Sequence, residues 1–379
     1  MKITLDDVED LVRGAAFLGT GGGGDPYVGR LMVNQALEDG GTVEIIDLND
    51  VPDDALIIPT AMMGAPTVLV EKLPSGDEAV KSLRALEEHL GRKAFATMPI
   101  ESGGINSTMP LVVGAKLGLP IVDADGMGRA FPELQMETFH VYGVPGTPMV
   151  ITNEWGDSAL IQTHDNLMME WLARGITIRM GGSAYIAEYC MDGATARRVS
   201  VPRTLSLNLI VGRTIREARE AHQNPFEALI RRLAETPYQF AKVIFEGKIL
   251  DVLRRTTEGF ARGEARIEGL DAFEGQTMEI LFQNENLIAR VDGSIKAVVP
   301  DLICILDIDT ADPITTEYLR YGQRVKVLGV SVPPIMRTPE ALAVFGPRAF
   351  GFDQEFTPIE DLDEPAPRGR QVSEEQVPL

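Results

Sequence analysis

The stretch "AFATMPIESGGINSTMPLVVGAKLGLPIVDAD", residues 94–125, decides the fold class of this chain. Short apolar runs at 94–100 and 119–125 flank an apolar segment at 108–118 that has the composition and length of a helix. A strand, a helix and a second strand in this order are typical of a βαβ unit, whose two strands pair in parallel. The stretch therefore predicts an α/β fold.

The same alternation continues on both sides of this stretch. Upstream, apolar runs predict strands at 42–48 and 55–63 and a helix at 77–91. Downstream, the pattern predicts three strands and then two helices, at 138–144, 148–154, 158–163, 165–175 and 205–221. This order predicts a largely parallel sheet covered by helices over residues 1–239.

The pattern changes after residue 240. Short alternating segments with turn signals fill 241–270, 277–307 and 324–332, and "VDGS" at 291–294 is typical of a hairpin turn. We therefore expect an antiparallel barrel or sandwich over residues 240–358. Residues 359–379 are polar and contain proline, and they have too little apolar surface to fold alone, so we expect a disordered tail.

Composition excludes several classes of partner. With 35 Lys and Arg against 56 Asp and Glu, the net charge of −21 repels phosphate backbones and anionic membranes. The start "MKITLDDVED" lacks the basic and apolar parts of a signal peptide, and no apolar run approaches the roughly 18 residues of a membrane span. We expect a cytoplasmic protein. The two cysteines, Cys190 and Cys304, have no CxxC partner and are more typical of apolar packing.

The stretch "FLGTGGGGDPYVGR", residues 17–30, joins two predicted helices through four consecutive glycines. A dinucleotide fingerprint needs a strand before the glycines, and a P-loop needs a lysine after them, so no nucleotide is expected. Two interpretations are open. The glycines allow the helices to pack closely, or they form a backbone nest against a small ligand, which would be bound by Gly21, Gly22, Gly23, Gly24 and Asp25.

Glycine-rich loops follow three predicted strands, at 62–66, 99–108 and 122–133. Ligands of open parallel sheets bind at the carboxyl ends of the strands. The last two loops supply the candidate catalytic acids Glu101, Asp123, Asp125 and Glu133, and the candidate substrate-binding residues Asn106, Ser107 and Arg129.

Asp123 and Asp125 are alternate residues, so in an extended chain both side chains would face the same side. They could then share a proton or hold a divalent metal such as zinc. The competing interpretation is that one of them caps the next segment while the other is solvated.

Three further polar positions are candidates. His164 lies beside Asp165 at a strand-to-helix junction, where it is either a metal ligand or part of a helix cap. Ser183 follows two glycines without a GxSxG elbow, and it would bond either a ligand or the backbone. In "QNENL", residues 283–287, the side chains of 284–286, beginning with Asn284, either face a cleft between domains or form a strand bulge or turn.

Seven ordered motifs carry a family resemblance: "GTGGGGDPY" (19–27), "DADGMGRAFPE" (123–133), "RMGGSA" (179–184), "FEGKILDVLRRTTEGFARG" (245–263), "FQNENL" (282–287), "VPDLIC" (299–304) and "LRYGQRVKVLG" (319–329). Over residues 4–358 the chain resembles the bacterial S-methyl thiohydantoin desulfurase-like family. The resemblance implies a three-layer α/β N-terminal domain, a β-barrel-like C-terminal domain and an association with hydantoin-utilisation enzymes. It implies no catalytic set, and Cys190 stands where relatives commonly carry proline.

Two functions are consistent with these patterns. The leading hypothesis is a hydrolase of a small cyclic amide, such as a hydantoin or S-methyl thiohydantoin, because attack by water needs a base, a polarising group and hydrogen-bond donors. Asp123 or Asp125 would be the base or hold the metal, and Glu101 or Glu133 would move protons. The alternative is a non-catalytic binding subunit that works with a hydantoinase-type partner, since no nucleophile–base pair is evident. A homo-oligomer is compatible with either hypothesis.

Overall fold

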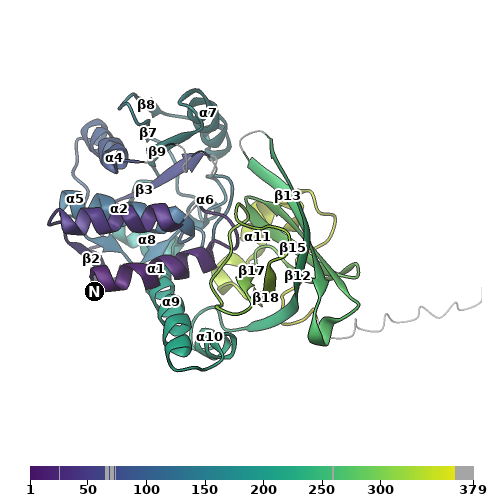
Figure 1. Cartoon of the computed structure of the whole chain (residues 1–379). Coiled ribbons are helices and arrows are strands. Elements are labelled where there is room, and N and C mark those ends of the chain that lie inside the picture. Colours follow the sequence, from purple (N-terminus) through teal and green to yellow (C-terminus); the bar gives the residue numbers. More distant parts are fainter. Residues whose placement is uncertain (25, 65–67, 69–71, 73, 258–259, 363–379) are drawn as a thin grey trace, which may run out of the picture.

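Two large β-sheets organise the chain in its computed structural model, which describes residues 1–24, 26–64, 68, 72, 74–257 and 260–362 (Figure 1). The first sheet lies with most of the helices in the N-terminal part, and the second is built by the C-terminal part. The fold is therefore mixed α/β, as the sequence predicts.

The first sheet has the strand order β1-β2-β5-β4-β3-β9-β7-β8, with β10 on β3. Its strands are β1 (Lys2–Ile3), β2 (Val43–Ile46), β3 (Leu56–Gly64), β4 (Ala96–Met98), β5 (Ile121–Val122), β7 (Met149–Thr152), β8 (Ser158–Ile161), β9 (Ser183–Ala187) and β10 (Met191–Asp192). A small separate ladder joins β6 (Ala124–Asp125) to β11 (Val201–Pro202).

The prediction of a largely parallel sheet is correct only for the middle of this sheet. Strands β2, β5, β4 and β3 pair in parallel, and β1, β7, β8, β9 and β10 pair antiparallel. Only residues 153–157 separate β7 from β8, and so short a connection forces antiparallel pairing. The sheet is therefore mixed.

The helices are α1 (Leu5–Leu18), α2 (Pro26–Glu38), α4 (Asp77–Leu90), α5 (Met109–Leu117), α6 (Thr138–Val141), α7 (Asn166–Arg179), α8 (Gly193–Val199), α9 (Thr204–Glu220), α10 (Pro225–Leu233) and α11 (Pro339–Phe345). Short 3-10 turns are η1 (Leu48–Asp50), η2 (Gly104–Ser107), η3 (Asp271–Phe273), η4 (Pro334–Met336) and η5 (Pro347–Phe350). The strand predicted at 138–144 is wrong, because α6 begins there. The N–H and hydroxyl of Thr138 both donate to the carbonyl of Gly126, which holds the chain in a helical turn.

Alternate residues of β3 enter different hydrophobic clusters. Ile58 and Met62 pack in a cluster with α4 and α5, whereas Ile57 and Ala61 pack in a cluster that includes residues of α7 and α8. Both faces of the strand are thus buried, which explains why "LIIPT" reads as a continuous apolar run. The three-layer description of this domain stays a prediction.

The second sheet is antiparallel throughout, in the order β16-β15-β14-β13-β12-β18-β17. Its strands are β12 (Ala241–Thr257), β13 (Phe260–Gly269), β14 (Thr277–Gln283), β15 (Glu285–Val291), β16 (Ser294–Val298), β17 (Leu302–Asp307) and β18 (Arg324–Val330). The sheet curls into a half-barrel (Figure 1), and among the described residues no ladder joins β16 to β17. The predicted barrel is therefore not closed.

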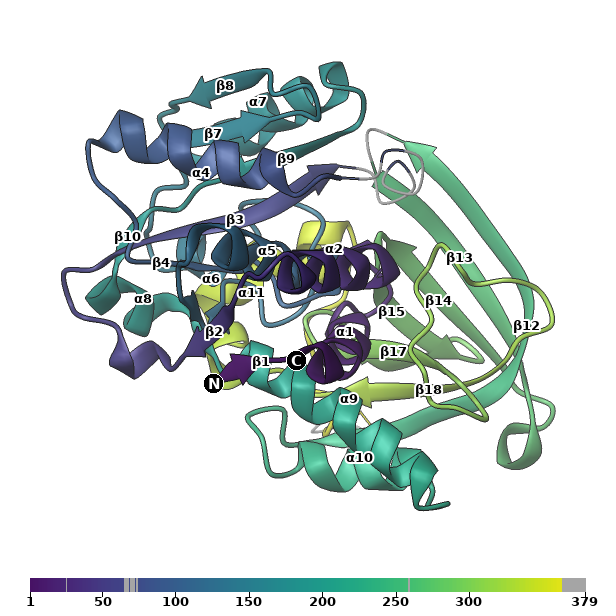
Figure 2. The same ribbon diagram turned by 60° about the vertical axis from the view of Figure 1, so that its left-hand side comes forward.

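A shared hydrophobic cluster joins the two parts of the chain. Phe17 and Leu18, at the end of α1, pack with Leu302 and Leu328 of the second sheet, and residues of α9 and α10 belong to the same cluster. Helices of the first part therefore cover one face of the half-barrel in place of a closing strand. Strand β3 points toward the second sheet (Figure 2), so the carboxyl end of the parallel strands lies near the junction.

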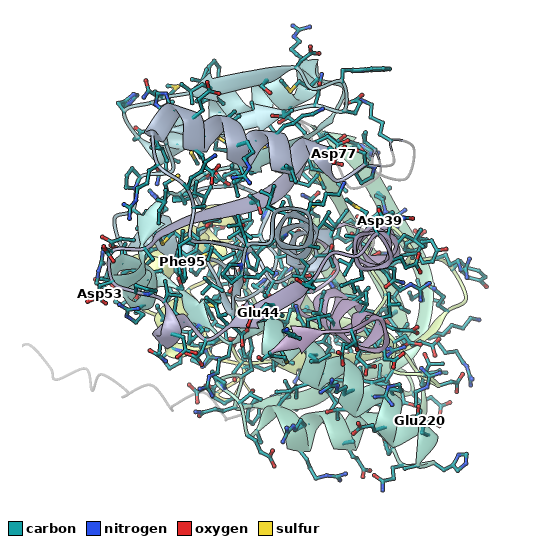
Figure 3. The ribbon with its side chains drawn as sticks, turned by 90° about the vertical axis from the view of Figure 1, so that its left-hand side faces the viewer. Asp39, Glu44, Asp53, Asp77, Phe95 and Glu220 are labelled. Atoms are coloured by element: carbon teal, nitrogen blue, oxygen red, sulfur yellow. The ribbon has the colours of Figure 1, made fainter. Side chains whose placement is uncertain are left out.

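The surface reflects the acidic composition. Asp39, Asp53, Asp77 and Glu220 are exposed and lie on the face shown in Figure 3. None of the described helices is long and apolar enough to cross a membrane. Of the predicted disordered tail, 363–379 lies outside the described residues, whereas Ile359 is fully buried in the second sheet's cluster.

Candidate functional site

A small buried chamber lies where the two sheets meet, with a volume of about 50 Å³. Residues 62–64 and 100–101 line it from the carboxyl ends of β3 and β4, and Met127 and residues 131–134 line it from the loop after β6. Gly23 closes it on the side of α1, and residues 284–285 reach it from the second sheet. All three loops predicted from the sequence, at 62–66, 99–108 and 122–133, contribute to this chamber.

Glu101 is the ionisable side chain that β4 delivers to the chamber. It is 4% exposed, its Oε1 accepts from Asn106 Nδ2 at 2.7 Å, and its Oε2 accepts from the N–H of Phe131 at 3.2 Å. Burial raises the pKa of Glu101 to about 7, although these two hydrogen bonds and the charge of Arg129 act to lower it. A carboxyl group with this pKa can accept or give a proton at neutral pH.

Asn106 holds Glu101 in place. Its Oδ1 accepts from the N–H of Met62 at 2.7 Å, and its Nδ2 donates to the carbonyl of Met62 at 3.0 Å as well as to Glu101. The amide is thus tied to β3 and to Glu101 at once, so both of its N–H donors are used. Asn106 lines the chamber, as the predicted substrate-binding role requires, but its hydrogen bonds make it a positioning residue for Glu101.

The turn between β14 and β15 brings Glu285 to the same chamber. Asn284 is the single residue between the two strands, and its φ is 57°. Its N–H donates to the carbonyl of Ala261, and its Oδ1 accepts from the N–H of Ala261. Glu285 is 2% exposed, and its Oε2 has no hydrogen-bond partner among the described residues. Burial and the charge of Glu101 raise the pKa of Glu285 well above its usual value, against the lowering effect of Arg129.

Glu101 and Glu285 are two buried carboxyl groups in the lining of the same chamber. Burial raises the pKa of Glu101 to about 7, and burial together with the charge of Glu101 raises the pKa of Glu285 well above its usual value. Buried carboxyl groups with strongly perturbed pKa values, placed together in a cleft, are typical of acid–base residues in enzymes. The pair is the main chemical feature of the chamber.

The glycine run packs tightly against both sheets. Gly21, Gly23 and Gly24 have positive φ, and a Cβ atom on Gly22 would lie 2.0 Å from Oε1 of Glu285. The carbonyl of Gly23 accepts from the N–H of Ile105 at 2.8 Å. Close packing is thus one reason for the glycines, and Gly23 also lines the chamber, which leaves the ligand-nest interpretation as a prediction. Asp25 lies outside the described residues.

Arg129 is a fully buried link between the two parts of the chain. Its guanidinium donates to the carbonyls of Ala130, Asn286, Pro300 and Asp301 at 3.0–3.1 Å. Burial lowers its pKa to about 10, so it stays charged at neutral pH. Arg129 is not in the lining of the chamber. It fixes the segment that carries Glu285 and supplies a positive charge nearby.

Asp123 and Asp125 bond to different protein groups. Asp123 accepts from the N–H of Ser206 at 2.9 Å and from the hydroxyl of Ser206, at the start of α9. Asp125 accepts from the N–H of Ser102 at 2.6 Å and from the N–H of Gly128 at 3.0 Å. Burial raises the pKa of both, and neither lines the chamber. Asp125 thus holds the loops on either side of Glu101.

The other predicted site residues are dispersed. Glu133 lines the chamber and accepts from Gln135, whereas the hydroxyl of Ser107 donates to the carbonyl of Gly104 at 2.6 Å. Ser183 starts β9 and lies outside the chamber lining. His164 is 73% exposed and pairs with Asp165 at 3.0 Å.

The predicted metal set is not assembled in one place. Asp123 is bonded to Ser206 and His164 to Asp165, on different elements of the fold. Across the part of the chain that the structure describes, no group of three or more His, Cys, Asp or Glu side chains is placed to hold a metal ion. The divalent metal stays a prediction.

Burial raises the pKa of Cys190 to about 12, which keeps it a thiol at neutral pH.

Two buried acids near the chamber did not follow from the sequence pattern. Glu137 and Glu188 are fully buried, and none of their four carboxyl oxygens has a hydrogen-bond partner among the described residues. Burial raises the pKa of both carboxyl groups well above the usual value. For Glu137 the charges of Glu188, Asp125 and Glu101 raise the pKa further. A glutamate directly after the apolar strand "SAYIA" was the available signal.

Comparison with known families identifies the fold's relatives. Residues 6–163 match the family model described as "S-Me-THD-like, N-terminal domain", and residues 164–359 match "S-Me-THD-like, C-terminal domain". The chain belongs to the S-Me-THD-like family. This confirms the resemblance inferred from the motifs. Among curated proteins, none matches the chain.

One solved structure shares the fold of this S-Me-THD-like chain. It is an X-ray crystal structure of a protein from Chromobacterium violaceum, determined as a structural genomics target, with a TM-score of 0.78. The two sequences are 23% identical, and the match covers 95% of this chain and 100% of the other. At this identity the likeness shows the fold alone and nothing about activity.

Proposed function

We propose that this chain hydrolyses the C–S bond of a small ring of the hydantoin type, with an S-methyl thiohydantoin as the first substrate to test. The observation that carries the proposal is the pair Glu101 and Glu285, two buried carboxyl groups with raised pKa values that line the same chamber. The family name supports the substrate class, and the acid–base pair supports a hydrolytic reaction.

The proposed reaction begins with attack of water on the ring carbon that bears the S-methyl group. A C–O bond forms, Glu101 accepts a proton from the water, and the protonated Glu285 donates to the ring nitrogen. In the second step Glu285 takes the hydroxyl proton, the carbonyl forms and the C–S bond breaks. The leaving methanethiolate receives the proton held by Glu101. The products are hydantoin and methanethiol, and both carboxyl groups return to their first state.

In this proposal Asp125 and Asn106 position the base, and they do not touch the substrate. Asp125 holds the N–H groups of Ser102 and Gly128, and Asn106 bonds Glu101 directly. The base is thus assigned to Glu101, in place of the aspartates considered from the sequence. The predicted metal on Asp123, Asp125 and His164 is tested separately, by elemental analysis of the purified chain.

The test is release of methanethiol and hydantoin by the purified full chain, followed with a thiol reagent and mass spectrometry. Glu101→Gln should lower kcat by about 10²- to 10⁴-fold, the usual contribution of a general base. Glu220→Gln, at an exposed surface position, is the matched control. Unchanged turnover in Glu101→Gln would overturn the assignment. Turnover only after addition of a hydantoinase-type protein would support the alternative of a non-catalytic subunit.

A further inference from the structure

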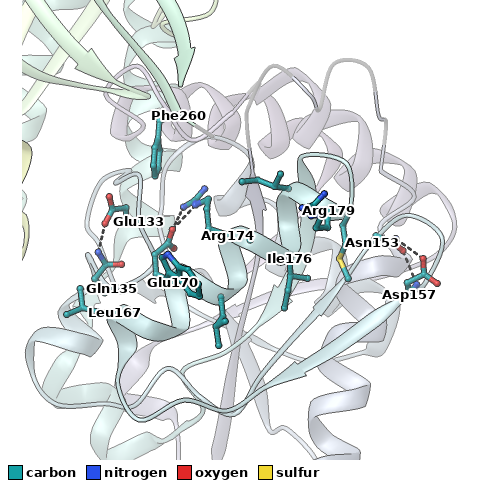
Figure 4. A pocket seen from close by; sticks show the side chains of 15 residues that line it. Glu133, Gln135, Asn153, Asp157, Leu167, Glu170, Arg174, Ile176, Arg179 and Phe260 are labelled. Carbon is teal, nitrogen blue, oxygen red and sulfur yellow. Dashed lines mark hydrogen bonds and ion pairs between the residues drawn. The ribbon is translucent and has the colours of Figure 1, made fainter. Parts of the chain in front are cut away.

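A large open groove of about 1000 Å³ adjoins the chamber. Helix α7 forms one wall with Leu167, Trp171 and Ile178, and Phe260 of β13 reaches it from the second sheet (Figure 4). Glu133 and Arg174 line both the groove and the chamber. The groove is therefore the outer part of the same interdomain opening.

The wall on α7 is unusually apolar for an exposed helix face. Leu167, Trp171 and Ile178 are 61%, 70% and 54% exposed, and their spacing of four and seven residues places them on one side of the helix. Exposed apolar side chains gathered in this way mark a binding surface. Phe260 completes the apolar lining, and the guanidinium of Arg174 lies 4.6 Å from the centre of its ring.

The sizes of the two spaces show how they would share a ligand. The chamber of about 50 Å³ has room for water and the reacting edge of a ring, because one water molecule takes about 30 Å³ in the liquid. The groove has the volume of a typical small-molecule site, about 300–1,000 Å³. A ring that reaches Glu101 must therefore leave its remaining substituent in the groove.

We propose that this groove is a specificity subsite for a ring substrate that carries an apolar substituent of aromatic or branched aliphatic size. The inference rests on the proposed function for the identity of the ring, and on the shared lining residues Glu133 and Arg174 for its place. The wall of Leu167, Trp171 and Phe260 removes the substituent from water, while the ring enters between the domains. An unsubstituted hydantoin would lack this contribution to binding.

The chain offers a direct optical test, because it contains only two tryptophans. Trp155 is 82% exposed and lies outside the groove lining, so Trp155→Phe leaves Trp171 as the sole tryptophan. The Trp155→Phe protein is titrated with 5-benzylhydantoin, which the proposed reaction does not consume, and with unsubstituted hydantoin. We expect a blue shift of Trp171 emission with 5-benzylhydantoin and a Kd at least tenfold lower than for hydantoin.

A matched pair of leucine variants checks the position of binding by calorimetry. Leu167→Asn, in the groove wall, should weaken binding of 5-benzylhydantoin about tenfold and leave hydantoin unaffected. Leu160→Asn, on β8 and 46% exposed, lies outside the groove lining and should change neither. Leu167→Met keeps an apolar side chain at this position and should bind 5-benzylhydantoin as the wild type does. This result would show that Leu167→Asn weakens binding through the lost apolar contact and not through local unfolding.

The outcomes distinguish this inference from the proposed function. Turnover of the ring substrates without any response of Trp171 or effect of Leu167→Asn would overturn the subsite and leave the function standing. Tight binding of 5-benzylhydantoin at Trp171 without turnover of any ring would support the subsite and overturn the hydrolase. Mass photometry showing a dimer that Leu167→Asn dissociates would assign the groove to a second copy of the chain and overturn the inference.

Discussion

The side-chain amide of Asn106 donates to Oε1 of Glu101 at 2.7 Å. The same amide also accepts from the N–H of Met62 and donates to the carbonyl of Met62. Glu101 is thereby tied to β3 as well as to β4, the two parallel strands whose carboxyl ends open into the chamber. A hydrogen bond to a carboxylate favours the ionised form. Asn106 therefore helps to keep the pKa of Glu101 close to 7 in spite of complete burial.

Asn106→Ala should raise the apparent pKa of the general base. The lost hydrogen bond no longer opposes the effect of burial, so kcat at pH 7 should fall about tenfold and recover as the pH rises. The measurement is a pH profile of kcat from pH 5 to 9 for the wild type and the variant. Asn49→Ala, at an exposed position, is the control. An equal loss of kcat at every pH would show that Asn106 acts through folding alone.

Glu137→Gln should stabilise the protein at neutral and alkaline pH. Burial raises the pKa of Glu137 well above its usual 4.5, so the folded state holds a proton that the unfolded state releases. The stability linked to this group is therefore complete below about pH 4.5 and is lost as the pH rises toward the folded-state pKa. A neutral amide of the same shape avoids the loss.

Thermal unfolding between pH 4 and 9 measures this effect. At pH 8 the Tm of Glu137→Gln should exceed that of the wild type by at least about 1 °C, the shift that corresponds to about 1 kcal/mol in a protein of this size. Near pH 4 the difference should vanish. Glu88→Gln, an exposed position on α4, should give no such pH-dependent change. A Tm difference that is constant with pH would contradict the explanation.

The sequence predicted those parts of the fold that depend on local patterns. The strand, helix and strand expected over 94–125 are β4, α5 and β5, because apolar spacing and flanking glycines act within a few residues. The antiparallel half of the first sheet was missed, since β9 joins β3 across more than 100 residues and no local pattern encodes that pairing. The packing of Phe17 and Leu18 of α1 against the second sheet likewise joins residues far apart in the sequence, which no local pattern encodes.

The candidate site was predicted to a similar extent. The strand-end rule directed attention to Glu101, and the unusual polarity of "QNENL" to Asn284 and its neighbours. Glu137 and Glu188 were missed because their proximity arises from tertiary packing between the start of α6 and the end of β9. Spacing in the sequence likewise does not show the hydrogen-bond partners of the two aspartates. Asp123 accepts from Ser206 of α9, and Asp125 accepts from Ser102 beside Glu101.

Gly14→Ala should strongly destabilise the first part of the fold. A Cβ atom on Gly14 would lie 1.8 Å from the carbonyl oxygen of Asn208, so α1 and α9 would have to move apart along their whole contact. Overpacking of this kind costs about 1–3 kcal/mol and occasionally more, so Tm should fall by several degrees. Gly175→Ala is the matched control, since nothing lies within 4 Å of its Cβ position and alanine favours a helix. A Tm of Gly14→Ala equal to that of the wild type would refute the close contact.

Gly22→Ala tests the contact between the glycine run and Glu285 within the proposed mechanism. A Cβ atom on Gly22 would lie 2.0 Å from Oε1 of Glu285 and 2.6 Å from its carboxyl carbon, so the acid must leave its position. Without a placed proton donor, kcat should fall by about 10²-fold, with a smaller change in KM. The measurement is steady-state kinetics, with circular dichroism and Tm as the check on folding.

The double variant Gly22→Ala with Glu285→Gln decides between displacement of the acid and general damage. If the alanine acts by displacing Glu285, removal of that carboxyl group costs little more, and the two losses are far from additive. If the alanine instead distorts the chamber independently, the losses multiply and the double variant is inactive. The second result would show that Gly22→Ala does not act through Glu285, whereas an unchanged kcat in Glu285→Gln alone would place the acid elsewhere.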